Sequence, residues 1–103
     1  MKIVKVTYTA KAEYAGQNKA NIQSVMNDLQ KLNCPNLNYH VCLGPDDKTF
    51  THTAFFKSDD DQKILLELPA FKYFQKQLKA SGPEVGPKQE LLSFVGSSKD
   101  IFK

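Results

Sequence analysis

The sequence predicts an α+β domain whose elements follow the order βαββαβ, and two kinds of periodicity indicate it. Three segments of alternating, β-branched and aromatic residues predict strands, at 2–9, 37–43 and 49–56. Two longer segments, 13–32 and 59–81, instead place apolar residues at helical spacing. With one more strand after the second helix, this is the ferredoxin-like, split βαβ arrangement. Its four-stranded antiparallel sheet carries both helices on one face.

The helix predicted over 13–32 follows a strand, 2–9, that is rich in Ile, Val and Thr. Its apolar residues return every three or four positions and so share one face: Ile22, Val25, Met26, Leu29 and Leu32. Gly16 lowers the helix propensity near the start, so the helix can begin later than residue 13. An Asn-Cys-Pro sequence at 33–35 predicts its end.

A short loop joins the second and third strands into a hairpin. Its sequence, Gly-Pro-Asp-Asp-Lys, is typical of turns. Pairing Gly44 with Thr49 across this loop places Val41 opposite His52, and His40 on the other face of the sheet. A slip of one residue in the pairing would instead move His52 to the face of His40.

The second helix is predicted to form in two parts. Ser58, followed by three Asp residues, indicates its N-terminus through a capping box with a short acid. Pro69 divides the helix and opens its second part. The apolar residues of the two parts are Ile64, Leu65, Leu68, Phe71, Phe74 and Leu78. A Gly-Pro pair ends the helix, and a loop at 83–88, a strand at 89–96 and a tail at 97–103 follow.

Alternation divides the strand residues between the two faces of the sheet. The more apolar set is predicted to face the helices: Val4, Val6, Tyr8, Tyr39, Val41, Leu43, Phe50, His52, Ala54, Phe56, Leu91, Ser93 and Val95. The opposite set is predicted to form an open face: Ile3, Lys5, Thr7, His40, Cys42, Thr51, Thr53, Phe55, Leu92 and Phe94. Only Lys5 is charged there, whereas a fully solvated face would carry more charge. We therefore expect a second copy of the chain to cover this face, giving a homodimer.

Composition limits the functions that are expected. The 103 residues predict one domain, over 1–103. All 14 basic residues are Lys, and a nucleic-acid binder without the planar fork of Arg is not expected. The sequence contains no signal-like segment and no apolar stretch that could span a membrane. Two Cys residues are too few for a disulfide framework, so we expect a cytoplasmic protein.

His52 is the best single candidate for chemistry, because it is predicted on a central strand among apolar side chains that face the helices. A His side chain can take or give a proton near neutral pH, or bind a phenolate. The phenol groups of Tyr8 and Tyr39 are predicted beside it, and Phe50 and Phe74 are expected to complete a binding cleft. The structural alternative is a core histidine satisfied by a hydrogen bond, with tyrosines whose hydroxyl groups reach water.

Other reactive side chains are better explained by structure. His40 is expected to make a polar contact at the dimer face. A metal pair of His40 and His52 is disfavoured because zinc sites usually need three or four protein ligands. Cys42 in mid-strand is typical of a small buried hydrophobe. The acidic run at 59–61 suits a helix N-terminus better than a metal site. The sequence also has no Gly-rich phosphate loop and no CxxC or HExxH motif, so neither a metal nor a cofactor is expected.

The chain resembles the dimeric α/β-barrel superfamily, and in particular the small cofactor-independent monooxygenases of the antibiotic-biosynthesis type. The features that carry this resemblance are the βαββαβ order, the divided second helix at 64–74, the strand at 50–56 and a closing strand near residue 92. The resemblance implies two sheets facing each other across a two-fold axis. It also implies a cleft between sheet and helices that holds an aromatic or polyketide-like substrate without metal or flavin.

Two functions follow from this resemblance. The first is a cofactor-independent monooxygenase in which His52 is the acid or base and Tyr8 and Tyr39 orient the substrate. The second is a non-catalytic dimeric binding or stress-response domain, in which side chains fill the cleft. Haem-degrading relatives use a His on the second helix and a Trp, and this chain has no His at 59–81 and no Trp. A connected cavity that touches His52 would distinguish the first function from the second.

Overall fold

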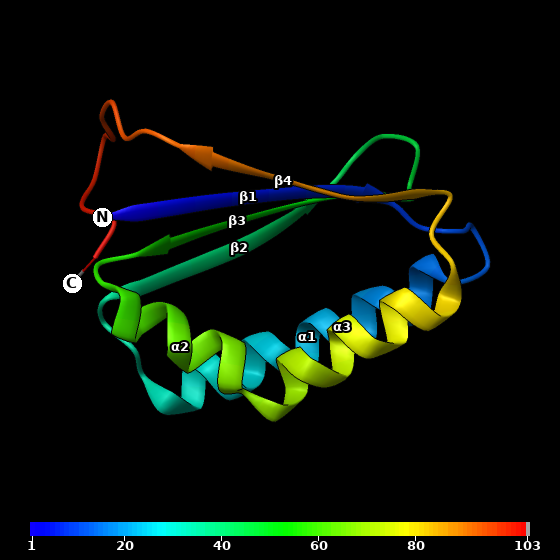
Figure 1. Ribbon diagram of the computed structural model, residues 1–103, viewed down its shortest axis with the longest axis horizontal. Coiled ribbons are helices and arrows are strands. Elements are labelled where there is room, and N and C mark those ends of the chain that lie inside the picture. The colour runs from blue at the N-terminus through cyan, green and yellow to red at the C-terminus, as the bar shows by residue number, and fades with distance from the viewer. Residues whose placement is uncertain (103) are drawn as a thin grey trace.

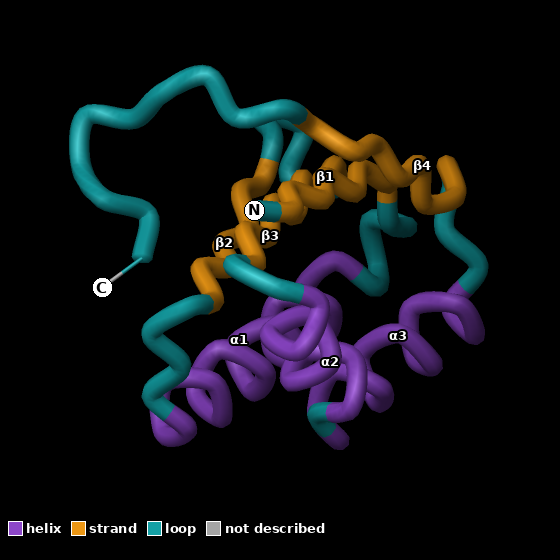
Figure 2. The backbone as a smooth tube through the Cα atoms, turned by 60° about the vertical axis from the view of Figure 1, so that its left-hand side comes forward, coloured by secondary structure: helices purple, strands orange, loops and turns teal. Residues whose placement is uncertain are grey.

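A computed structural model describes residues 1–102 and shows the predicted α+β fold (Figure 1). The elements in chain order are β1 (Lys2–Thr9), α1 (Ala15–Leu32), β2 (Leu37–Leu43), β3 (Thr49–Phe56), α2 (Asp59–Glu67), α3 (Pro69–Ser81) and β4 (Val85–Leu92). The four strands form one sheet in the order β2-β3-β1-β4, and every neighbouring pair is antiparallel. All three helices lie on the same side of the sheet (Figure 2).

The hairpin has the predicted register. The Gly44 amide donates to the Thr49 carbonyl across the turn at 2.8 Å, and Val41 pairs with His52. On the other side of β3, Val6 of β1 also pairs with His52. The carboxylate of Asp46 accepts hydrogen bonds from the backbone amide and the hydroxyl group of Thr49, which holds the turn closed. A slipped register is therefore excluded, and His52 lies at the centre of the helix-facing side.

The helix ends follow the predicted signals. Helix α1 begins at Ala15, within the range allowed by Gly16, and ends at Asn33, whose φ of 52° is left-handed. Ser58 and Asp61 form the capping box that opens α2, in which the Asp61 carboxylate accepts from the Ser58 amide at 2.9 Å. Pro69 is the first residue of α3, so the chain turns between the two parts as expected.

The last strand corrects a prediction. It was expected over 89–96, but β4 spans Val85–Leu92, so Ser93, Phe94 and Val95 lie outside the sheet. Pro83 and Pro87 lie before residue 89, and they had indicated a loop there. Because β4 pairs only with β1, the other edge of the strand needs no backbone amides, and such an edge strand tolerates proline. On the helix side, β4 consequently presents Gln89 and Leu91, which pair with Val6 and Val4.

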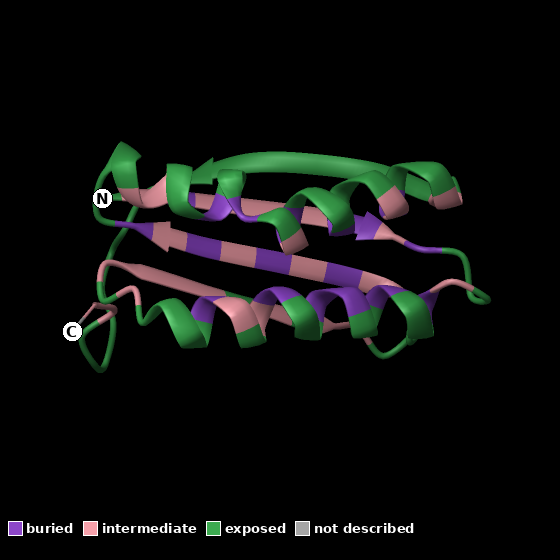
Figure 3. Cartoon of the chain, turned by 90° about the horizontal axis from the view of Figure 1, so that it is seen from below, coloured by how far each residue is buried: buried purple, intermediate pink, exposed green. Residues whose placement is uncertain are grey.

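Burial is concentrated under the helices. Along β3 the side chains alternate between buried and half-buried, and Phe50, His52, Ala54 and Phe56 are the buried set (Figure 3). Buried residues of α1 and α3 pack beneath them, including Val25, Leu29, Phe71, Phe74 and Leu78. Strand β4, by contrast, is exposed along its whole length. One edge of the helix-facing side is therefore less covered than its centre.

The tail after β4 returns toward the start of β2 (Figure 2). The Asn38 side-chain amide, on the open face, donates to the Ile101 carbonyl at 3.1 Å. Ile101 and Phe102 are half-buried. The tail was predicted over 97–103, and its last residue, Lys103, lies outside the described residues. None of the helices within residues 1–102 is long and apolar enough to cross a membrane.

Candidate functional site

A cavity of about 470 Å³ lies between the helix-facing side of the sheet and helices α2 and α3. Its lining is mainly apolar: Val4, Val6, Ala54 and Phe56 from the sheet, Leu65, Leu66, Phe71, Phe74 and Leu78 from the helices. Pro83, Gly86 and Pro87 border it beside β4, which leaves the cavity open along this edge. A volume of this size suits a small organic molecule rather than a filled core.

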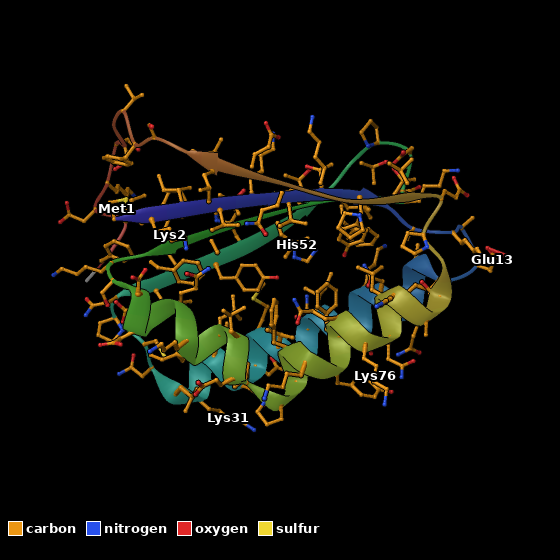
Figure 4. The ribbon with its side chains drawn as sticks, viewed as in Figure 1. Met1, Lys2, Glu13, Lys31, His52 and Lys76 are labelled. Atoms are coloured by element: carbon orange, nitrogen blue, oxygen red, sulfur yellow. The ribbon has the colours of Figure 1, made fainter. Side chains whose placement is uncertain are left out.

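His52 projects from β3 toward the helices and is 5% exposed (Figure 4). Both of its ring nitrogens are engaged by phenol groups. The Tyr8 hydroxyl lies 2.8 Å from Nε2, and the Tyr39 hydroxyl lies 2.5 Å from Nδ1. All three side chains form part of the cavity lining. Because neither nitrogen is free, a proton passing between His52 and a bound ligand has to cross a tyrosine hydroxyl.

A fourth polar side chain extends this network, and sequence reasoning missed it. Asn18 of α1 is fully buried, and its Nδ2 donates to the Tyr8 hydroxyl at 2.7 Å. Its Oδ1 is buried and has no hydrogen-bond partner among residues 1–102. Asn18 lies four residues before Ile22, on the apolar face of the helix. A polar residue at helical spacing from the buried apolar residues was the signal in the sequence that could have identified Asn18.

Burial keeps the tyrosine and histidine side chains neutral. It lowers the pKa of His52 from its usual value of 6.5 to about 4. Burial also raises the pKa of Tyr8, although the Asn18 hydrogen bond acts in the opposite direction, and it raises the pKa of Tyr39. At neutral pH the site therefore holds a neutral imidazole between two neutral phenols. Such a site can donate and accept hydrogen bonds without carrying a net charge.

Aromatic rings surround the polar network. The Phe74 ring centre lies 5.3 Å from that of His52, and Phe71 meets Tyr39 edge-on at 6.2 Å. Phe50, which was expected to help form the cleft, stacks on Tyr8 at 5.5 Å and lies outside the cavity lining. Phe50 thus packs against the Tyr8 ring without lining the cavity, whereas Phe74 is part of the lining.

The open edge of the cavity is polar. Gln62, Gln75 and Gln89 line it together with Lys79, which among the described residues is the one charged side chain of the lining. The Lys2 ammonium donates to the Gln62 side chain at 2.9 Å. No Asp or Glu within residues 1–102 lines the cavity, so its charge favours a neutral or anionic ligand.

The remaining candidates lie elsewhere. His40 and Cys42 are exposed on the open face, where His40 lies 6.0 Å from the Phe55 ring. Asn21 of α1 donates from its Nδ2 to the hydroxyl of Tyr14, the residue before this helix, at 3.3 Å, and both side chains lie outside the cavity lining. Within residues 1–102, no three His, Cys, Asp or Glu side chains group together as ligands for a metal ion.

Several solved structures share this fold. A candidate antibiotic biosynthesis monooxygenase from Deinococcus radiodurans is 18% identical, with all of both chains covered and a TM-score of 0.72. A second candidate of the same description, from Nitrosomonas europaea, is 14% identical over 93% of this chain and all of its own, at 0.76. SnoaB, a cofactor-independent oxygenase from Streptomyces nogalater, is 13% identical over 96% of each chain, at 0.66.

Sequence comparison gives no closer relationship, since no family model and no curated protein match the chain. The structural likeness nevertheless covers the whole βαββαβ unit, and it confirms the resemblance proposed from the divided second helix and the strand order. The chain therefore has the fold of the antibiotic biosynthesis monooxygenase-like proteins.

Proposed function

We propose that this protein is a cofactor-independent monooxygenase that acts on an aromatic or polyketide-like molecule. The observation that carries the proposal is the 470 Å³ cavity, whose apolar walls enclose the hydrogen-bonded group of Tyr8, His52 and Tyr39. A cavity touching His52 is the feature that a filled, purely structural core would lack. The fold shared with SnoaB, a cofactor-independent oxygenase, supports the same class of reaction.

The shape of the site favours a flat, aromatic ligand. Phe71 and Phe74 border the cavity with their rings, while the polar atoms of the lining gather at the tyrosine–histidine group and at the open edge. Ligand pockets of this kind combine apolar walls with a few polar groups that fix orientation. A ligand oxygen placed against the tyrosine hydroxyls would be held close to the His52 imidazole, which can accept a proton.

In the proposed reaction, the substrate supplies the electrons and the protein moves the proton. His52 takes a substrate proton through a tyrosine hydroxyl, which leaves a substrate anion in the cavity. The anion combines with dioxygen to form a hydroperoxide, with the proton returned to oxygen. Loss of water then leaves a carbonyl group on the substrate. One oxygen atom enters the product and the other leaves as water, so no further reductant is needed.

We also propose that the working unit is a homodimer of single-domain chains, assembled through the open face of the sheet. Thr7, Thr51, Thr53 and Phe55 are only half-buried there, and Lys5 is the charged member of the set. A second copy would cover these side chains and also Leu92 of β4, which is 42% exposed. The free thiols of Cys34 and Cys42 suit the expected cytoplasmic setting.

Turnover tests the role of His52. A dihydroxynaphthalene or an anthrone is incubated with the protein under ¹⁸O₂, and oxygen uptake and label in the product are measured. We expect the His52→Gln variant, which keeps a polar group between the tyrosines, to lose roughly 100-fold in rate. Equal rates for the two proteins would remove His52 from the mechanism. Binding of the aromatic compound without any turnover would instead support the non-catalytic binding domain.

Blocking the cavity tests the location of the site. Gly86 borders the cavity, and an added Cβ there would meet no atom within 4 Å. We expect Gly86→Leu to weaken binding of the aromatic compound without unfolding the protein. Gly96 is equally unobstructed but lies outside the cavity, so Gly96→Leu is the matched control. Equal weakening by both variants would show that the ligand binds elsewhere.

A further inference from the structure

The hydrogen bonds around His52 have a direction, and the buried end of the network determines it. Asn18 Nδ2 is the donor to the Tyr8 hydroxyl at 2.7 Å, so the Tyr8 oxygen is already an acceptor. Tyr8 is 1% exposed, and among the described residues its hydroxyl hydrogen has one acceptor, His52 Nε2 at 2.8 Å. A buried hydroxyl hydrogen without an acceptor is costly, so Tyr8 donates to Nε2.

The tautomer of His52 follows from that bond. A neutral imidazole carries one N–H, and Nε2 is occupied as an acceptor, so the hydrogen is on Nδ1. Nδ1–H then donates to the Tyr39 oxygen at 2.5 Å. The Tyr39 hydroxyl hydrogen has no acceptor among the described residues, and Tyr39 lines the cavity. This hydrogen is therefore free for a ligand.

The orientation of the Asn18 amide decides between this chain and its reverse. The opposite orientation would place Oδ1 of Asn18 against the Tyr8 hydroxyl, and it would reverse the donor and acceptor in each hydrogen bond from Tyr8 to Tyr39. It would also leave the buried amide nitrogen of Asn18 without an acceptor among the described residues. The orientation in the structure leaves Oδ1 unpartnered instead. Orphaned buried N–H donors are rarer in proteins than under-satisfied carbonyl oxygens, which favours the direction described.

We infer that Asn18 is a positioning residue that gives the two cavity tyrosines different tasks: Tyr8 passes a ligand proton inward to His52, and Tyr39 donates a hydrogen bond outward to a ligand oxygen. The inference rests on the proposed function for the identity of the ligand, but the direction of the chain belongs to the free protein. It also assigns the basic nitrogen of the site as Nε2, the one behind Tyr8.

The proton step is then defined atom by atom. A ligand hydroxyl gives its proton to the Tyr8 oxygen as the Tyr8 proton moves to Nε2. The ligand becomes an anion and His52 becomes an imidazolium, while Tyr8 ends as a neutral phenol. The low pKa of the buried imidazole opposes this step, and the ligand anion formed nearby offsets the cost of the positive charge. The Tyr39 hydrogen bond is available to a ligand oxygen on the other side of His52.

Nitrogen-15 NMR of the ligand-free protein tests the direction without any substrate. The two ring nitrogens of His52 give distinct signals, depending on which carries the hydrogen. At neutral pH we expect a single Nδ1–H tautomer. A signal from the Nε2–H tautomer would overturn the inference, whether or not the protein proves to be a monooxygenase.

The role of Asn18 is tested by Asn18→Leu, with Asn21→Leu as the matched control. Asn21 is also a buried Asn on α1, but it bonds to Tyr14 and Gln17 rather than to Tyr8. We expect the His52 signals of Asn18→Leu to show a mixture of tautomers, whereas those of Asn21→Leu stay as in the wild type. A pure Nδ1–H tautomer in folded Asn18→Leu would remove Asn18 from this role. If Asn18→Leu does not fold, the wild-type tautomer remains the deciding result.

Kinetics separates the two tyrosines. Tyr8→Phe breaks the proton path, so we expect kcat with a dihydroxynaphthalene to fall by about 100-fold. Tyr39→Phe removes one donor to the ligand, so we expect KM to rise by about 10-fold with little change in kcat. The opposite pattern would reverse the assigned tasks. An absence of turnover in the wild type would count against the proposed function alone, since the tautomer is measured independently.

Discussion

Each face of the sheet carries one histidine, and the two histidines differ in burial and in hydrogen bonding. His52 is buried on the helix-facing side between Tyr8 and Tyr39, and both of its nitrogens are bonded. His40, on the adjacent strand, is exposed on the open face beside Phe55. The helices and the cavity, not the residue type, distinguish the candidate site from the exposed surface.

The comparison also explains why the two faces suit different partners. The helix-facing side keeps a mainly apolar cavity, and the hydrogen-bonded group of Tyr8, His52 and Tyr39 forms part of its lining. On the open face, Thr7, Thr51, Thr53 and Phe55 are half-buried, and we expect a second copy of the chain to cover them. If this is correct, substitutions on the open face should affect assembly, and substitutions on the helix-facing side should affect ligands and stability.

Charging the open face should have the largest effect. Thr7 and Thr51 pair on that face, on the two central strands of the sheet. Changing both to Lys would bring several like charges together across the two-fold axis of the proposed dimer. Such repulsion costs several kcal/mol, so we expect dimer affinity to fall by about 100-fold or more, as measured by sedimentation equilibrium. Gln23→Lys, on the exposed side of α1, is the control. An unchanged dimer in the double variant would place the interface elsewhere.

Acid should destabilise the helix-facing side through His52. Its pKa is 6.5 in an unfolded chain and about 4 in the folded protein, so the unfolded state binds more protons between these values. The stabilisation from keeping His52 neutral is therefore complete above pH 6.5 and is lost as the pH falls through 4. The full loss is roughly 3 kcal/mol, measurable by urea unfolding at a series of pH values.

The pH dependence should disappear with the buried histidine. The His52→Gln variant is expected to lose this part of the profile, whereas His40→Gln, altered at an exposed position, is expected to keep it. Coinciding profiles for His52→Gln and the wild type would show that the buried imidazole does not control acid stability.

Two phenylalanines on opposite faces provide a smaller contrast. Phe74 is buried against His52, so Phe74→Leu should cost about 1–2 kcal/mol of unfolding free energy and weaken binding of an aromatic compound. Phe55→Leu, on the open face, should leave ligand binding unchanged and weaken only the dimer. Thermal unfolding and fluorescence titration of both variants measure the difference. Weakened ligand binding in Phe55→Leu would contradict the separation of the two faces.

The smallest effect is expected at the open edge of the cavity. Lys79 is exposed, so removing its charge by Lys79→Gln should weaken an anionic aromatic ligand by less than about 1 kcal/mol. The effect should decrease further in high salt, because exposed charges are screened. Lys5→Gln removes a charge from the other face and is the control. If Lys5→Gln weakened ligand binding equally, the effect would come from the net charge of the protein and not from the position of Lys79.

Much of the fold could be read from local pattern, and His52 illustrates why. The alternation in 49–56 and the turn residues after Leu43 act over a few positions, so they determine both the register of the hairpin and the face that His52 occupies. The same holds for Ser58 and Pro69, whose effects on the backbone are local. These features needed no knowledge of distant segments.

Only the tertiary structure determined which side chains hydrogen-bond to one another in the site. Asn18 and Tyr8 belong to different elements, and Tyr8 and His52 are 44 positions apart, so their hydrogen bonds depend on how α1 packs against the sheet. Phe50 lies behind Tyr8 rather than in the cavity for the same reason. The start of β4 was also missed, because Pro87 within it favours a loop and is tolerated here at an edge of the sheet. Periodicity assigns a side chain to a face, but the packing of distant segments chooses its neighbours there.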